Sequence, residues 1–257
     1  MSILGDYHTH TVYSHGCGSI EDNVRAAIKA GLKEVAITDH GFFHGSYGVR
    51  RMDLPEIRGE IKRLRIKYPE IKIFLGVEAN LIDCFGGVDI EEEDEEWLDI
   101  LVCGYHKNVN ASSTAEFFNY NLPNLLGGVT KFTSKQIVKN TDAYIKALGR
   151  YKIDIISHPN YGIKTDVVEI AKAAAHYGTF MELNGKKVSM TDQEIENILK
   201  TDVTLIVNSD GHSAERVGCF EVPFSYVNRL NIPTDRIANF DKIPSFRRYR
   251  EELNGRG

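Results

Sequence analysis

Short apolar runs of strand length recur along this chain, and almost every one of them ends in histidine, aspartate or glutamate. A clear example is Val-Ala-Ile-Thr at residues 35–38, which Asp39 and His40 follow at once. Segments long enough for a helix or an extended loop separate the runs, and this alternation predicts a parallel sheet. The runs are continuously apolar, as is typical of strands that are covered on both faces. The sequence therefore favours an α/β fold.

Seven strands are predicted, over residues 4–10, 34–38, 71–77, 97–103, 153–156, 179–183 and 203–207. Helices are predicted over residues 19–31, 54–68, 134–151, 166–177 and 191–201. Thr191 with Glu194 three residues later forms a capping box, and Gly178 follows the fourth helix as a stop signal. Seven β/α units in 257 residues, with no linker-like composition, favour one domain over residues 1–257 folded as a TIM-barrel-like barrel.

Composition indicates which kinds of partner the chain can bind and in which cellular compartment it works. The formal net charge of −5 argues against a protein that grips nucleic acid, although a metal ion can still attract a small phosphorylated substrate. The four cysteines form no C-x-x-C pair and are typical of reduced thiols. No signal-peptide pattern and no run of about 20 apolar residues is present, so we expect a cytoplasmic protein without a membrane segment. The oligomeric state is not readable from the sequence.

Two histidines near the start of the chain stand two residues apart. If residues 4–10 form a strand, its period of two places the imidazoles of His8 and His10 on one face. Two neutral imidazoles on a rigid face make half of a metal site. Taken alone this pair is weak evidence, and its weight comes from what recurs downstream.

Six of the seven predicted strands end in a potential metal ligand. In a parallel α/β barrel the carboxyl ends of the strands meet at one mouth, where the active site lies. We therefore expect residues scattered over the chain to converge there. The candidates are His8, His10, His15, His40, Glu78, His106, His158, Asp210 and His212, with Asp39 beside them. His44 lies in a loop that would cover the same mouth.

This donor set predicts a multinuclear metal centre. Seven imidazoles with Glu78 and Asp210 suffice for two or three ions if a carboxylate bridges, and they suit Zn, Mn or Fe better than Mg or Ca. Adjacent ions lower the pKa of a bound water and clamp attacking and leaving oxygens, which is chemistry for phosphate ester hydrolysis. Asp39 has two open interpretations, a helix N-cap or a partner that orients a ligating imidazole.

The ordered motifs resemble those of the PHP (polymerase and histidinol phosphatase) family, in particular its small stand-alone bacterial phosphatase-like members. The resemblance extends from residue 6 to residue 212 and is carried by Asp6-Tyr7-His8-Thr9-His10, Ser14-His15-Gly16, Thr38-Asp39-His40, Gly76-Val77-Glu78, Gly104-Tyr105-His106, Ser157-His158-Pro159 and Ser209-Asp210-Gly211-His212. It implies a distorted seven-stranded (β/α)7 barrel with a trinuclear metal site.

Carried over by position, the resemblance implies three ligand sets. One metal takes His8, His10, Glu78 and Asp210; a second takes Glu78 as a bridge with His106 and His158; a third takes His15, His40 and His212. The chain departs from the family pattern at His15, where Asp is common. Imidazole can still ligate, so the departure affects the metal preference of the third site.

The expected activity is hydrolysis of a small-molecule phosphomonoester by a hydroxide that bridges two of the ions. Glu78 and Asp210 would serve catalysis as ligands, and Asp39 or His40 would supply a proton to the leaving oxygen. We expect the loops at residues 41–52 and 107–130 to shape the pocket. Cations placed to bind phosphate are Arg50, Arg51, Lys186, Lys187 and Arg216.

Three other functions use the same residues. A nuclease or phosphodiesterase would share the metals, but the acidic balance and the absence of a basic or aromatic strip disfavour it. A non-catalytic metal-binding module is a second alternative, which the complete ligand set disfavours. Amide hydrolysis by a metal barrel is a third, but such sites use a carboxylated lysine or bridging acid, and Lys107 is the one lysine at a strand end.

Overall fold

The computed structural model describes residues 2–127 and 129–246, and within them seven parallel strands stand side by side in chain order. Each strand pairs in parallel with the next along the chain. The strands are β1 (Gly5–Asp6), β2 (Glu34–His40), β3 (Lys72–Asn80), β4 (Ile100–Gly104), β5 (Ile155–Ile156), β6 (Phe180–Asn184) and β7 (Leu205–Asn208). This order confirms the predicted parallel sheet.

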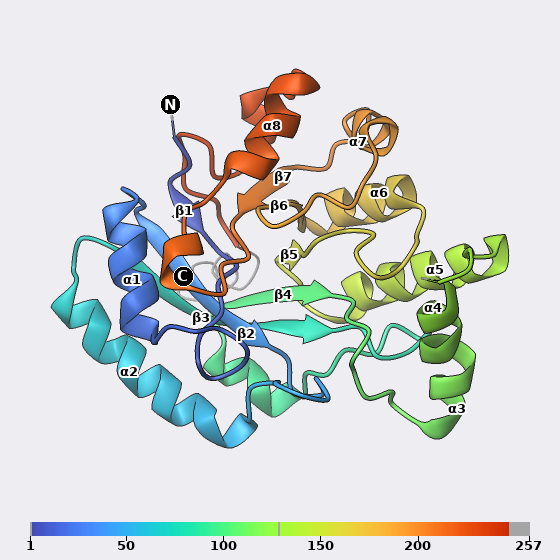
Figure 1. Ribbon diagram of the computed structural model, residues 1–257, viewed down its shortest axis with the longest axis horizontal. Helices are drawn as coiled ribbons and strands as arrows, with labels where there is room; N and C mark the ends of the chain where they lie inside the picture. The colour runs from blue at the N-terminus through green and yellow to red at the C-terminus, as the bar shows by residue number, and fades with distance from the viewer. Residues whose placement is uncertain (1, 128, 247–257) are drawn as a thin grey trace, which may run out of the picture.

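The sheet curves until its two edges meet, so that the barrel is nearly closed (Figure 1). The edges are joined past the ends of β1 and β7 by a parallel bridge between Thr9 and Gly211. The backbone N–H of His10 donates to the Gly211 carbonyl at 2.8 Å. The N–H of Tyr7 donates to the side-chain oxygen of Asn208 at 2.9 Å. The predicted (β/α)7 barrel is confirmed.

Helices lie outside the strands (Figure 1) and begin and end where local signals place them. The capping box of Thr191 and Glu194 is present, and Gly178 takes the left-handed conformation with φ of 70° after its helix. The α-helices are α1 (Ile20–Lys29), α2 (Leu54–Lys67), α3 (Thr114–Glu116), α4 (Leu122–Gly127), α5 (Ser134–Arg150), α6 (Val167–Tyr177), α7 (Asp192–Ile198) and α8 (Glu221–Arg229). Shorter turns are η1 (Arg51–Asp53), η2 (Glu92–Trp97), η3 (Phe117–Asn121, a π-helix), η4 (Ala214–Arg216) and η5 (Thr234–Arg236).

Several predicted boundaries were wrong. β2 and β3 continue through His40 and Glu78, which are paired in register, because ladder hydrogen bonds do not require an apolar side chain. The segment 107–130, expected to be a loop, contains α3, η3 and α4. The acidic run at residues 90–96 contains most of η2, and Asp94 is buried there against Arg51.

Side chains inside the barrel change from apolar to polar along β3. On β3 the period of two turns Phe74, Gly76, Glu78 and Asn80 towards the same interior. The apolar end is a buried cluster formed by Tyr7, Ala36, Phe74, Ile100, Val102, Ile155, Ile206, Ala238 and Phe246. This cluster lies under the polar mouth and separates it from the opposite end of the barrel.

Phe246 closes the apolar end, with ring centroids 4.8 Å from Tyr7 and 5.8 Å from Phe74. Phe74 precedes Glu78 by four residues, or about 13 Å along a strand. Phe246→Ala is therefore expected to lower the free energy of unfolding by about 3–5 kcal/mol and to leave the metal content unchanged. Urea denaturation and elemental analysis measure the two effects. Ile66→Ala, at a position 83% exposed on α2, is the matched control, and equal stability of the two variants would contradict the assignment.

Candidate metal centre

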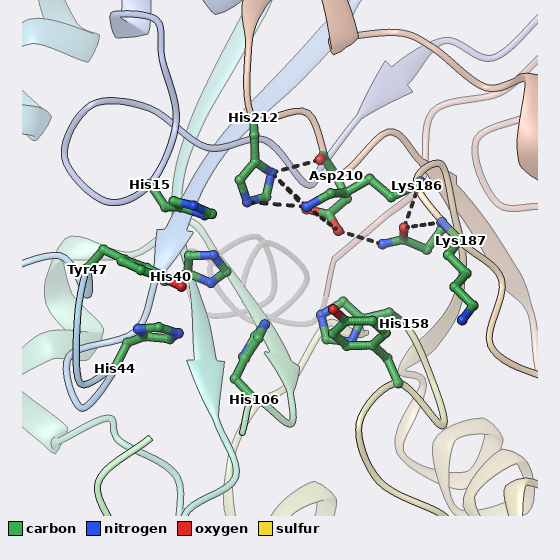
Figure 2. A pocket seen from close by; sticks show the side chains of 12 residues that line it. His15, His40, His44, Tyr47, His106, His158, Lys186, Lys187, Asp210 and His212 are labelled. Atoms are coloured by element: carbon green, nitrogen blue, oxygen red, sulfur yellow. Dashed lines mark hydrogen bonds and ion pairs between the residues drawn. The ribbon is translucent and has the colours of Figure 1, made fainter. Parts of the chain in front are cut away.

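The carboxyl ends of the strands bring eight of the nine predicted ligands to the mouth of the barrel. His40 is the last residue of β2, and Glu78 lies two residues before the end of β3. The other ligands lie just past a strand end. Figure 2 shows the side chains of His40, His106, His158, Asp210 and His212 around one central space. The convergence expected from the sequence is therefore present.

Among residues 2–127 and 129–246, potential ligand atoms form three groups, and within each group every pair of atoms lies within 4.8 Å. The groups overlap, because His10 and His40 each belong to two of them. They are His8, His10 and Asp210; His10, His40 and His212; and His40, Glu78 and His106. Overlapping groups are the arrangement that a cluster of neighbouring ions requires.

Glu78 lies at the centre and is fully buried. Its Oε1 is 2.7 Å from His158 Nε2 and 3.2 Å from His8 Nε2. Its Oε2 is 2.9 Å from His40 Nδ1, 3.5 Å from His106 Nε2 and 3.6 Å from His10 Nε2. One carboxylate thus faces imidazoles on both oxygens, which is the geometry of a bridging ligand.

Asp210 shares His8 and His10 with Glu78 and also faces His212. Its Oδ1 is 3.2 Å from His10 Nε2 and 3.3 Å from His212 Nδ1. Asp210 and His158 both have positive φ, 53° and 29°, although neither is glycine. Such backbone conformations are uncommon and cluster at functional sites, where the surrounding structure enforces them.

Many polar atoms in this cluster are buried and have no hydrogen-bond partner within the described part of the chain. They include both ring nitrogens of His10, His8 Nε2, His40 Nδ1, His158 Nδ1 and Glu78 Oε2. A buried polar atom left unpaired costs about 1–3 kcal/mol, so this many would be unfavourable without another occupant. Imidazole nitrogens and carboxylate oxygens are ligands for Zn, Mn and Fe. The residues present therefore fit divalent transition-metal ions.

Burial and the neighbouring carboxylates shift the pKa values of the cluster in different directions. At His8 and His158 the carboxylates, Glu78 above all, outweigh burial and raise the pKa of both rings. Burial lowers the pKa of His10 and His106 well below the usual range and that of His212 to about 4, which keeps these rings neutral. Burial favours the protonated form of Glu78, but the imidazoles of His8, His106 and His158 outweigh it and hold its pKa well below the usual value. Neutral imidazoles and ionised carboxylates are the forms that bind metal.

Two residues missed by the sequence analysis orient the ligands. Glu182 on β6 places Oε1 2.8 Å from His8 Nδ1 and accepts a hydrogen bond from the backbone N–H of His158 at 2.8 Å. Asn80 places Oδ1 2.8 Å from His106 Nδ1. The available signal was their polarity: Glu182 interrupts an apolar run, and Asn80 follows Glu78 by one strand period.

His15 lines the cavity over the cluster, and Asp39 lies beside the loop that carries His15. His15 is on an exposed loop, with ring centroids 5.0 Å from His212 and 6.1 Å from His40, and it stacks on Tyr47 at 4.2 Å. It belongs to none of the three ligand groups. Asp39 accepts hydrogen bonds from the Thr11 backbone N–H and hydroxyl, both at 2.7 Å, and from the Ser14 hydroxyl. Its oxygens hold the loop after β1, and among the described side chains it forms no hydrogen bond with an imidazole of the cluster.

Of the predicted phosphate-binding cations, the two lysines line the cavity at the mouth, and the three arginines do not. Arg50 forms a bidentate pair with Asp53, with both bonds at 2.7 Å. Arg51 pairs with Asp94 at 3.0 Å, and Arg216 lies near a backbone carbonyl at 3.5 Å. Nearby acids and a carbonyl engage these arginines in the structure, which loop composition did not reveal.

The cavity over the centre has a volume of about 310 Å³. Lys186 and Lys187 line it, as do His44 and Tyr47 from the loop after β2, which confirms that residues 41–52 shape the pocket. Lys186 Nζ is 3.8 Å from Asp210 Oδ2. Tyr161 and Asn184 also line the cavity and were not anticipated. Among residues 2–127 and 129–246, every helix is too short or too polar to span a bilayer.

Comparison with known proteins identifies the family. Residues 6–192, well over half of the chain, match the model of the PHP domain. The chain belongs to the PHP family. A protein of Caldanaerobacter subterraneus subsp. tengcongensis named "probable phosphatase" is 28% identical, covering 100% of this chain and 96% of its own. A protein of the same name from Thermoanaerobacter sp. strain X514 is 30% identical, covering 94% and 92%.

A solved structure supports the fold of this PHP chain. Histidinol phosphate phosphatase from Lactococcus lactis subsp. lactis, in complex with Zn, L-histidinol and phosphate, superposes with a TM-score of 0.62. The two chains are 16% identical, and the match covers 91% of this chain and 95% of the other. At that identity the likeness shows the (β/α)7 fold.

Gly104 has no side chain, and residues that contact Glu78 occupy the space where its side chain would lie. A Cβ at this position would lie 2.3 Å from Ser157 Oγ and 2.8 Å from His158 Cε1, two residues that contact Glu78. Gly104→Ala is therefore expected to lower the free energy of unfolding by about 1–3 kcal/mol and to reduce bound metal. Thermal denaturation and elemental analysis measure these effects.

Gly59 on α2 is the matched control, because a Cβ there has no atom within 4 Å. Gly59→Ala is expected to raise the free energy of unfolding by about 0.5–1 kcal/mol with unchanged metal content. If Gly104→Ala behaved like Gly59→Ala, the close packing around Glu78 would not be required for the centre.

Metal removal is expected to destabilise the protein, because the ligand atoms lose their partners while still buried. Saturation at 100 times the dissociation constant adds about 2.7 kcal/mol of stability. Thermal denaturation before and after exhaustive chelation, and again after adding Zn or Mn, measures the difference. An unchanged melting temperature would count against a metal centre at this mouth.

Proposed function

We propose that this chain is a metal-dependent phosphatase that hydrolyses a small-molecule phosphomonoester at a centre of three divalent transition-metal ions, Zn, Mn or Fe. Membership of the PHP family and full-length relatives named probable phosphatases support the hydrolase class. The observation that carries the proposal is Glu78, whose two buried oxygens face five imidazoles below a cavity lined by Lys186.

The proposed ligands divide into three sets around this carboxylate. His8, His10, Glu78 and Asp210 would hold one ion, and Glu78, His106 and His158 a second. His40 and His212 would hold the third together with His15, which lies on their open side. The 4.8 Å group of His10, His40 and His212 adds His10 as a neighbour of this last set.

When bound, such ions stabilise charge on phosphate oxygens as Lewis acids and lower the pKa of water that attacks phosphorus. The chain's own residues would then position the substrate. Lys186 extends over the centre from the loop after β6, where its Nζ lies between His212 Nδ1 at 3.3 Å and Asp210 Oδ2 at 3.8 Å. A fixed ammonium there would attract a non-bridging phosphate oxygen.

Two earlier assignments change in this mechanism. Asp39 is proposed to hold the loop that carries His15, because its oxygens already accept hydrogen bonds from Thr11 and Ser14. His40 is proposed as a ligand only, because its Nδ1 faces Glu78 at 2.9 Å and lacks a hydrogen-bond partner among the described side chains. Proton delivery to the leaving oxygen is therefore not assigned to either residue.

A small substrate suits the cavity better than a polynucleotide. The space over the centre is about 310 Å³, which corresponds to a compact ligand. The Lactococcus lactis structure holds phosphate and the small alcohol L-histidinol. By this likeness we propose a small phosphorylated compound as substrate here, with nucleic acid disfavoured also by the net charge of −5.

Metal-dependent release of phosphate from small monoesters is the expected result of an assay with Mn or Zn. Chelation should abolish release, and Glu78→Gln should lower it by at least about 100-fold because a bridging ligand loses its charge. Glu169→Gln, which changes an exposed glutamate of α6, is the control and should leave the rate unchanged.

Three outcomes would redirect the proposal. Activity that survives chelation would remove the metals from the mechanism. Cleavage of single-stranded DNA without hydrolysis of monoesters would favour the nuclease alternative. A fully loaded centre that turns over no ester of either kind would favour the non-catalytic module.

A further inference from the structure

A second cavity of about 550 Å³ continues outward from the cavity over the metal centre. The two spaces share five lining residues, so a ligand can extend from one into the other. The shared residues are His44, Tyr47, His106, Tyr161 and Lys187. We call this second space the outer cavity; Lys107, Asn108 and Ser189 are among the residues that line it alone.

The wall of the outer cavity is preformed by two paired loops. The N–H of Gly45 donates to the Asn108 carbonyl at 2.8 Å, and the N–H of Asn110 donates to the Phe43 carbonyl at 2.9 Å. An antiparallel bridge joins His44 to Val109 between these bonds. This pairing fixes the start of the segment after β4, and with it the position of Lys107.

The charge of the outer cavity is opposite to that of the whole chain. Its lining contains Lys107 and Lys187 and neither aspartate nor glutamate, although the chain carries a net charge of −5. Neither ammonium has an acidic partner within 4.0 Å among the side chains of residues 2–127 and 129–246. By contrast, Lys186, which lines the cavity over the metal centre, faces Asp210. Two unpaired cations in one concave lining favour an anion.

Aromatic rings line the space between the metal centre and the two lysines of the outer cavity. Tyr47 and Tyr161 line both cavities and are 38% and 47% exposed. Tyr47 is fixed by stacking on His15 and His44, with ring centroids 4.2 and 4.3 Å apart, and Tyr161 lies edge-on to His158 at 5.1 Å. Such rings offer an apolar surface to the carbon frame of a ligand.

We infer that the outer cavity binds the leaving group of the ester, and that this leaving group carries a second anionic group, phosphate or carboxylate, held by Lys107 and Lys187. The inference rests on the phosphatase function proposed above. It names the substrate class as small bisphosphates or phosphorylated acids. A leaving group that carries an ammonium would meet two like charges and is disfavoured.

Matched esters test this substrate class. Alkyl phosphates with two to six carbons are compared with hydroxyl, ammonium, carboxylate or phosphate at the far end, using Mn-loaded enzyme at low salt. At the best length, kcat/KM for a far carboxylate or phosphate is expected to exceed that of the hydroxyl ester by about tenfold, and the ammonium ester should be the poorest. Added salt should reduce the preference, because the lysines are exposed.

Lys107→Gln identifies the source of the preference. It should reduce the ratio of kcat/KM for the far-phosphate ester to that for the hydroxyl ester by about fivefold, and Lys107→Arg should retain most of that ratio. Lys62→Gln, at an exposed lysine of α2, is the control and should leave the ratio unchanged. Because the readout is a ratio, a general loss of active enzyme does not affect it.

The outcomes separate this inference from the proposed phosphatase function. If no ester in any arm releases phosphate, the phosphatase proposal fails. If the hydroxyl ester is hydrolysed but the four far ends react equally, or the ammonium ester reacts best, the second-anion inference is overturned while the phosphatase proposal stands. An anion preference that Lys107→Gln leaves intact would overturn the assignment to the outer cavity. Selective product formation from the carboxylate or the phosphate arm distinguishes the two anions.

Discussion

The structure depends on one buried carboxylate, Glu78, and on the imidazoles that face it. A fully buried charge with no counter-charge would be strongly unfavourable, so the fold must surround it with cations or potential metal ligands. The barrel does this by placing side chains from several strand ends around one axis, which local structure alone cannot achieve. Gly104 on the neighbouring strand matters for the same reason, because any side chain there would displace Ser157 and His158 from the carboxylate. Tertiary topology thus determines whether Glu78 is tolerated.

The apolar end of the barrel makes this polar mouth possible. Along β3 the interior positions run from Phe74 through Gly76 to Glu78 and Asn80, so one strand serves both the core and the site. Phe246 seals the lower end against Tyr7 and Phe74, which lets a small barrel bury enough apolar surface to offset the cost of its ligands. Glu182 and Asn80 then fix the ring orientations of His8 and His106. Successive interior positions of one strand therefore supply first the packing that stabilises the barrel and then the ligands of the site.

Sequence patterns predicted the barrel and the convergence of its ligands because both depend on short-range order: apolar runs, their spacing, and the polar residue that ends each run. The same patterns could not place His15, because a loop conformation, set by bonds from Thr11 and Ser14 to Asp39, determines where that ring lies. They also did not reveal the partners of Arg50 and Arg51, which are Asp53 three residues further along the chain and Asp94, brought close by tertiary packing. Glu182 was missed because its partner His8 is 174 residues away in the chain. The sequence therefore did not predict the contacts of side chains that have several possible partners nearby.

The two cavities differ in how charge is arranged, and this difference bears on how the site selects its ligands. At the centre, the carboxylates of Glu78 and Asp210 lie among imidazoles, and Lys186 faces Asp210 at 3.8 Å, so the charged groups there have partners within the site. In the outer cavity Lys107 and Lys187 face solvent without such compensation, and their field extends over about 10 Å at ordinary salt. On the proposed function, an approaching phosphoester would be attracted first by the outer lysines and would meet the ligand cluster afterwards. The loops would then select among phosphorylated compounds, and a loop can change without disturbing the barrel. The strand ends would carry the chemistry, and they cannot change in this way.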